Sequence, residues 1–213
     1  MNKSTNTKEA IVEAAVHLFY MKGYAATSIR DIAAKAGSNS ANISYYFNHK
    51  QGLLEHCFTD FFEGYIDGLE ILAEQMGEVG PKECLVRYAK FCLNYYRDHF
   101  LLARFVLREI SVDSSLSREI YMTYLSKEKF FLKMILDEGM KNGLFKSVSI
   151  PMFVTKVKAI LNEPFIQAQY LMEVWQIFPN ELYFVNSYQL EVEDFLNDSL
   201  FMDVSYVLPA GLN

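Results

Sequence analysis

Apolar residues recur at helical spacing along nearly the whole chain. The first such stripe comprises Ile11, Ala14, Ala15, Leu18 and Phe19. It predicts an amphipathic helix that ends at Lys22-Gly23, because a basic last turn followed by glycine is a typical helix stop. No run alternates convincingly between apolar and polar residues, and Leu182 to Val185 is the only brief exception. The pattern therefore predicts an all-α fold.

Two short helices are predicted after the first one. Ser28 is followed three residues later by Asp31, a variant of the capping box, and the apolar stripe that follows ends at Gly37. The segment 38–40 can turn the chain and cap again, and Ile43 with Phe47 gives the next helix one buried edge. Three helices within fifty residues form a compact unit, so we expect a first domain over residues 1–49.

The remaining helices are longer and form a second expected domain over residues 50–213. They are predicted at 50–76, 81–96, about 99–110, 114–141, 151–177 and 179–206. Gly77 and Gly80 close the first of them, and Pro81 suits the first turn of the next. Pro164 is expected to kink or break its helix near Ile160, because proline removes an internal hydrogen bond.

Net charge alone argues against a nucleic-acid partner, since the chain of 213 residues carries −6. The charges are unevenly placed, however. Residues 1–56 hold six basic and four acidic side chains, a net +2, and the remaining 157 residues therefore carry −8. An acidic body repels a duplex, so we expect the first domain to be the end that meets DNA.

The stretch from Ser28 to Phe47 has the anatomy of a helix-turn-helix. A helix with the small residues Ala33 and Ala36 allows close approach of a second helix across a glycine turn. The exposed edge of that second helix carries Ser40, Ala41, Asn42, Ser44, Tyr45 and Tyr46. Such an edge fits the major groove, where asparagine pairs with adenine, alanine contacts the thymine methyl and hydroxyls reach bases or phosphates. Lys50, at the start of the next helix, is expected to bind a phosphate.

The segment GYAATSIRDIAAKAGSNSANISYYFNHKQGLLE resembles the DNA-binding head of the TetR family. The resemblance implies an all-α homodimer with a three-helix head and a larger helical body that dimerises and often binds a ligand. By position it implies that Thr27 caps the second helix and contacts phosphate, that residues 40–42 face bases, and that Tyr45, Tyr46 and Lys50 hold the DNA backbone. Ser38-Asn39 after the turn glycine and Ser44 at a position often occupied by tyrosine depart from the family pattern.

Within the family, SNSANISYYF followed by GLLEHCFTDFFEGY resembles most a DNA-binding protein of sporulating bacilli linked to chromosome capture and cell-division control. This likeness implies binding at chromosomal motifs and a cell-division protein as a further partner. The alternative is a ligand-gated repressor with a small-molecule pocket in the body. The expected DNA partner is in both cases a palindromic double-stranded site.

The last two long helices are the expected dimer interface. The candidate residues are Phe153, Val157, Leu161, Leu171 and Trp175 on one, and Val185, Val192 and Phe195 on the other. Paired across a two-fold axis they would form a four-helix interface. A dimer would place two recognition helices at half-sites about 34–36 Å apart. The same stripes could instead belong to the core of a single chain.

Two aromatic stripes in the body are either packed core or the wall of an effector pocket. They comprise Phe58, Phe61, Phe62 and Tyr65, and then Tyr88, Phe91, Tyr95 and Tyr96. No convergent polar set identifies a ligand, so both interpretations stand. Arg104 and Arg108 share a helix face and are a candidate docking patch for a protein partner.

Several classes of function have no support in the sequence. Nucleophile-elbow, phosphate-loop, dinucleotide and HExxH motifs are absent, so we expect no enzyme and no cofactor. The spacing of His49, His56 and Cys57 matches no common zinc pattern, and we expect no metal. Charged residues interrupt every long apolar run, so no membrane span is expected, and the polar start is not a secretory signal. Three cysteines without an even framework fit reduced thiols in a cytoplasmic, nucleoid-associated protein.

Overall fold

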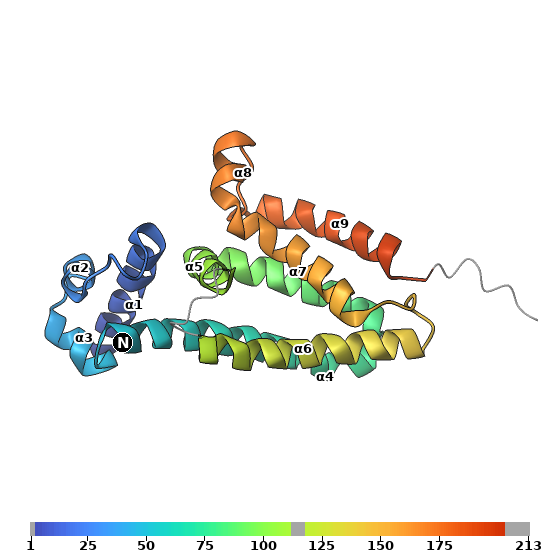
Figure 1. The fold of residues 1–213 in the computed structure, drawn as a ribbon, viewed down its shortest axis with the longest axis horizontal. Helices are drawn as coiled ribbons and strands as arrows, with labels where there is room; N and C mark the ends of the chain where they lie inside the picture. Colours follow the sequence, from blue (N-terminus) through green and yellow to red (C-terminus); the bar gives the residue numbers. More distant parts are fainter. Residues whose placement is uncertain (1–2, 112–117, 203–213) are drawn as a thin grey trace, which may run out of the picture.

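The computed structural model describes residues 3–111 and 118–202, and in this part the chain forms helices throughout (Figure 1). They are α1 (Lys3–Lys22), α2 (Ile29–Lys35), α3 (Ser40–Phe47), α4 (Lys50–Asp98), α5 (Phe100–Ser111), α6 (Arg118–Lys141), α7 (Ile150–Ile166), α8 (Ala168–Val174) and α9 (Leu182–Ser199). The only β pairing in the described ranges is an isolated bridge between Phe145 and Phe201. The predicted all-α fold is confirmed. Residues 114–117 and 203–206 of two predicted helices lie outside the described residues.

Helices α1 to α3 gather at one end of the molecule, and α4 leads from this head into the body (Figure 1). In the body, α4 packs mainly against α6 and α9, and α7 packs on α5. Helix α1 also contacts α5, which gives the head a second connection to the body besides the chain itself. Helix α8 projects from the body beyond the end of α7 (Figure 1).

Helix α4 contains the break that its glycine and proline residues predict. Gly80 has φ 79° and ψ 165°, a left-handed region that glycine adopts readily, and Pro81 follows at once. Gly77 stays helical, so the first half continues up to the break at Gly80 instead of ending at Met76. The predicted pair of helices is therefore correct, with its boundary a few residues later.

The predicted helix break near Ile160 is wrong, and the alternative of a kink there stays a prediction. Helix α7 is continuous from Ile150 to Ile166, with Pro164 in its last turn. The carbonyl of Ile160, which Pro164 cannot bond, accepts a hydrogen bond of 3.0 Å from the Tyr188 hydroxyl on α9. This distant partner offsets the loss. The predicted helix 151–177 instead divides at Gln167 into α7 and α8.

The two aromatic stripes of the body form its core. Six of the eight side chains are buried, and Phe91 and Tyr95 are half-buried. Their rings contact one another closely, for example with 5.2 Å between the centroids of Phe61 and Tyr95. Because each fully buried large side chain contributes about 1.5–3 kcal/mol, the stripes account for much of the stability of the body.

Candidate nucleic-acid interface

Each helix of the helix-turn-helix begins at a side-chain cap. The Ser28 hydroxyl accepts a hydrogen bond from the backbone N–H of Asp31, and the Asp31 carboxylate accepts one from the N–H of Ser28. These bonds lower the pKa of Asp31 below its usual value. At α3, the Asn39 side chain accepts a bond of 2.9 Å from the N–H of Asn42. The departure at Asn39 therefore preserves a helix cap.

Helix α3 has one buried and one exposed side. Ile43 and Phe47 are buried, whereas Tyr45 is 81 % exposed. The Tyr45 ring contacts the Tyr46 ring edge to face, with 5.0 Å between the ring centroids. Ala41 and Ser44 are also exposed, and Ser40, Asn42 and Tyr46 are half-buried. The six side chains predicted to face DNA thus lie together on the outer side of one short helix. Such a helix can enter a major groove about 12 Å wide.

Asn42 has a neighbour that the sequence did not reveal. Its side-chain Nδ2 donates a hydrogen bond of 2.9 Å to the Ser38 hydroxyl. Bidentate pairing with adenine needs one N–H and the oxygen of this amide. Because the NH₂ group carries two donors, Asn42 can hold Ser38 with one and keep the other for a base. Ser44 similarly donates to the carbonyl of Ser40 at 3.3 Å.

The expected roles of Thr27 are wrong. The Thr27 residue is 1 % exposed. Its hydroxyl donates to the carbonyl of Gly23 at 2.8 Å and to that of Leu18 at 3.3 Å. Ser28, the next residue, is the one that caps α2. Thr27 therefore ties the start of α2 to the end of α1, and its hydroxyl is not available to a phosphate.

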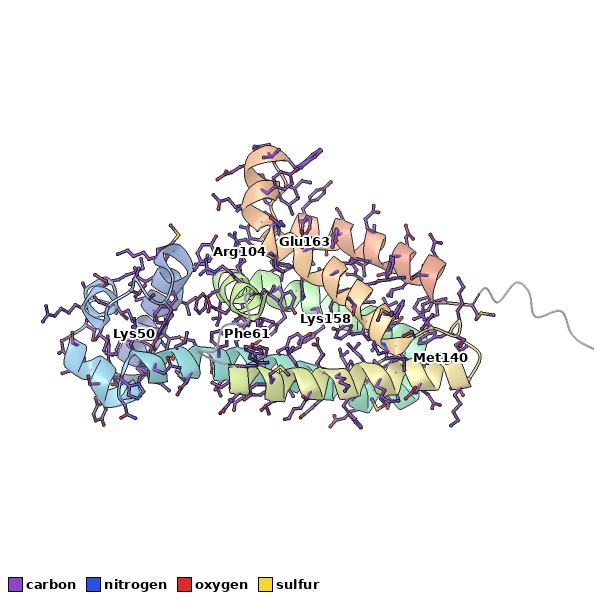
Figure 2. The ribbon with its side chains drawn as sticks, viewed as in Figure 1. Lys50, Phe61, Arg104, Met140, Lys158 and Glu163 are labelled. Atoms are coloured by element: carbon purple, nitrogen blue, oxygen red, sulfur yellow. The ribbon has the colours of Figure 1, made fainter. Side chains whose placement is uncertain are left out.

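Lys50 also has a structural role that the sequence did not predict. Its ammonium nitrogen donates to the carbonyls of Tyr24 at 2.9 Å and Thr27 at 2.8 Å, and it lies 4.2 Å from the centroid of the Tyr24 ring. Two of its three N–H groups are thus used to hold the loop between α1 and α2. Only the third remains for the predicted phosphate contact. Lys50 stands at the head end of α4 (Figure 2).

The predicted dimer residues divide into two groups. Phe153, Val157, Leu161, Val185 and Val192 are each 5 % exposed or less within the single chain. Leu171 and Phe195 are half-buried, and Trp175 is 61 % exposed. Five of the eight are thus core side chains of the single chain and have almost no surface left for a second copy. The stripes were periodic because α7 and α9 pack on the body of the same chain.

The predicted docking pair Arg104 and Arg108 lies where the head meets the body. The Arg104 Nε donates to the carbonyl of Phe165 at 3.1 Å, and its guanidinium carbon lies 4.7 Å from the centroid of the Tyr20 ring. Arg108 is exposed and donates to the carbonyl of Phe19 at 3.3 Å. Arg104, on α5, therefore connects α1 and α7 through these contacts. Of the two arginines, only Arg108 has the exposure expected of a docking residue.

Cys57 has the environment of a core residue. It is buried, and burial raises the pKa of its thiol to about 12. Within the described ranges, no group of three or more His, Cys, Asp and Glu residues is arranged to hold a metal ion. The same ranges contain no helix long and apolar enough to cross a membrane.

A three-helix head with an exposed recognition helix, attached to a larger helical body, defines a helix-turn-helix regulator. Residues 11–57 match the sequence profile of the family described as bacterial regulatory proteins, tetR family. The probable HTH-type transcriptional regulator YttP of Bacillus subtilis (strain 168) is 42 % identical over 188 residues, which cover 88 % of this chain and 91 % of that protein. The chain belongs to the TetR family of helix-turn-helix transcriptional regulators.

Solved structures have the same fold. The TetR family regulator PfmR from Thermus thermophilus matches with a TM-score of 0.71 and 24 % identity, over 89 % of this chain and 97 % of that chain. The ketosteroid transcriptional regulator KstR2 of Mycobacterium tuberculosis matches with a TM-score of 0.77 and 13 % identity, over 95 % and 98 % of the two chains. At such identities the likeness concerns the fold. All three relatives named here are described as transcriptional regulators.

Proposed function

We propose that the protein binds double-stranded DNA as a homodimer through α3, with residues 1–49 as the reading head and residues 50–213 as the body. The observation that carries this proposal is the outer side of α3, where Tyr45 is 81 % exposed although the opposite side is buried. Apart from its edge contact with the half-buried Tyr46, this large aromatic side chain lies in solvent beside Ala41 and Ser44 and is not part of the core. The phosphate contacts would make affinity fall steeply with salt.

Replacing Tyr45 with Ala is expected to weaken DNA binding about tenfold, since a contact to phosphate or base is worth about 1–3 kcal/mol. Stability should stay within about 0.5 kcal/mol, because the side chain is a surface one. Affinity is measured by fluorescence anisotropy on a fragment recovered by genome-wide mapping of bound sites, and stability by thermal unfolding. The control is Phe130→Ala on α6, a side chain 72 % exposed in the body. Equal affinity of Tyr45→Ala and the parent protein would contradict the assignment.

We place the dimer contact on the exposed apolar surface of α8, the segment that follows it and the outer side of α9. This surface includes Tyr170, Val174, Trp175, Phe178, Leu182, Tyr183 and Leu190, each at least 45 % exposed. Scattered exposed apolar residues are normal, but seven within 21 positions are typical of an interaction site. The projecting position of α8 leaves this surface open to a second copy (Figure 1).

Trp175→Glu is expected to shift the protein from dimer to monomer. Buried tryptophans at interface centres contribute at least about 2 kcal/mol, a change of roughly thirtyfold in the dimer dissociation constant. Light scattering at micromolar concentration measures the mass, and Phe130→Glu makes the same kind of change on α6. A monomeric parent protein, or an equal effect of both variants, would exclude this interface.

We further propose a chromosomal role, in which the DNA-bound dimer positions a partner protein of cell division. Its support is the similarity of the segment around α3 and the start of α4 to RefZ, the sporulation DNA-binding protein of bacilli. Genome-wide mapping tests the role. Sites spread near the replication origin without changes in transcription support it, whereas sites confined to promoters with changed transcription contradict it.

A second candidate is a ligand-gated repressor. A cavity of about 180 Å³ lies between α4, α5, α6 and α7, and its lining includes Phe61, Tyr96 and Asn162. The buried side-chain oxygen of Asn162 has no hydrogen-bond partner among the described residues. A small molecule with a donor group could satisfy it, and a coupling of about 1–3 kcal/mol would change operator affinity by 5–150-fold.

A further inference from the structure

A second, more polar pocket lies outside the body core, at the junction of head and body. Its volume is about 510 Å³. Tyr20 at the end of α1 contributes from the head, Arg104 and Arg108 contribute from α5, and Gln167 and Gln169 contribute from the link between α7 and α8. A molecule in this pocket would therefore touch both parts of the protein at once. Figure 2 shows Arg104 between the head and the base of α8.

Arg104 is held firmly at this pocket. Its Nε donates to the carbonyl of Phe165, and its guanidinium carbon lies 4.7 Å from the ring centroid of Tyr20 and 5.4 Å from that of Phe100. Aromatic rings on two helices thus restrict the guanidinium plane, so that little conformational entropy remains to be lost on binding. Arginine held in this way is suited to bidentate pairing with a carboxylate or a phosphate.

The pocket has an excess of positive charge. No Asp or Glu lines it among the described residues, and the structure gives Arg104 no carboxylate partner within the same ranges. Burial lowers the pKa of Arg104, Arg108 lowers it further, and Tyr20 opposes the shift. The guanidinium of Arg104 is thus partly desolvated beside a like charge, an arrangement that a bound anion would stabilise.

We propose that this junction pocket binds a small organic anion, whose carboxylate or phosphate group pairs with Arg104. Its apolar part would lie against Met21 and Ile166, which line the same pocket and are 63 % and 38 % exposed. Because the anion contacts α1 and the α7–α8 link together, it restrains the head relative to the body. Binding itself does not depend on the proposed DNA-binding function, and only its regulatory consequence does.

The test is a titration of the full chain without DNA, followed by NMR at the Arg104 Nε–Hε resonance, which the variant Arg104→Gln identifies. The probes are benzoate, phenyl phosphate and the neutral benzamide. We expect a saturable shift with benzoate or phenyl phosphate and none with benzamide, and the responding probe reveals which acid group is preferred. The amides of residues 19–23 should also exchange more slowly with solvent when the pocket is filled. A titration with no saturable shift, or an equal shift with benzamide, would overturn the proposal.

A charge placed in the pocket provides the matched test. Gln167→Glu adds a carboxylate beside Arg104 and should weaken binding of the responding anion at least about tenfold. Gln176→Glu makes the same substitution at an exposed position outside the lining and should leave binding unchanged. This pair keeps the test decisive if Arg104→Gln does not fold. Unchanged affinity in Gln167→Glu would count against the site. Since no DNA is present, a protein that fails to bind DNA still gives a clear answer here.

Discussion

Replacing Lys158 with Met is expected to lower the free energy of unfolding by about 3–5 kcal/mol, because it leaves a carboxylate uncompensated in the core. The carboxylate is that of Glu128, which is only 4 % exposed. Its Oε1 accepts hydrogen bonds from the Lys158 ammonium at 2.7 Å, the Tyr88 hydroxyl at 2.8 Å and the Tyr65 hydroxyl at 2.5 Å. The cluster connects α4, α6 and α7, and Figure 2 shows Lys158 between α7 and the α4–α6 layer.

Two variants separate this effect from a general loss of lysine. Lys156→Met changes an exposed lysine on the same helix and should alter stability by no more than about 0.5 kcal/mol. The double variant Glu128→Leu/Lys158→Met removes both charges and should be more stable than Lys158→Met alone, although Tyr65 and Tyr88 lose their acceptor. Urea unfolding followed by circular dichroism measures all three. A double variant no more stable than Lys158→Met alone would contradict the account.

The same pair gives stability a defined pH dependence. Burial alone would raise the pKa of Glu128, but the charge and hydrogen bond of Lys158, with the bonds from Tyr65 and Tyr88, lower it overall. Burial likewise opposes the charged form of Lys158, and Glu128 outweighs it and raises the pKa of Lys158. The stabilisation is therefore complete between the unfolded-state pKa values of about 4.3 and 10.4, and it is lost below and above this range. The difference in stability between the parent protein and the double variant, measured from pH 3 to 11, should show this plateau.

The sequence predicted the fold class and the recognition unit because both depend on local signals. Helical periodicity is a property of neighbouring turns, and the box formed by Ser28 and Asp31 spans four residues. The break at Gly80 and Pro81 was likewise visible in two adjacent residues. Each of these features is determined by residues that are close in the chain, so pattern analysis was sufficient.

The features that the sequence missed depend on partners far away in the chain. Lys50 bonds carbonyls 23 and 26 residues earlier, and Glu128 and Lys158 are 30 residues apart. In the sequence alone, nothing distinguishes either of these lysines from an ordinary surface lysine. Thr27 and Ser28 could both cap a helix, and only the backbone course decides between them. Periodicity in α7 and α9 shows an apolar face but does not show whether the same chain or a second copy covers it.

Gly52→Ala is expected to destabilise the head and to reduce DNA binding more than tenfold. A Cβ at this position would come within 2.2 Å of the carbonyl oxygen of Phe47, a backbone atom in the last turn of α3. That oxygen cannot move freely, because it also accepts a bond of 2.7 Å from the N–H of His49, and the Phe47 side chain is buried. The clash must therefore displace the end of the recognition helix from α4, and overpacking of this kind costs about 1–3 kcal/mol.

Gly77→Ala is the matched control for this substitution. Gly77 lies in the same helix, is exposed, and has no neighbouring atom within 4 Å of the position that an alanine methyl group would occupy. There alanine should be neutral or stabilise the protein by up to about 1 kcal/mol, since it reduces the freedom of the unfolded chain. Thermal unfolding and anisotropy on a mapped DNA fragment measure both variants. If Gly52→Ala folds and binds as well as Gly77→Ala, the close approach of α4 to the end of α3 is not what positions the recognition helix.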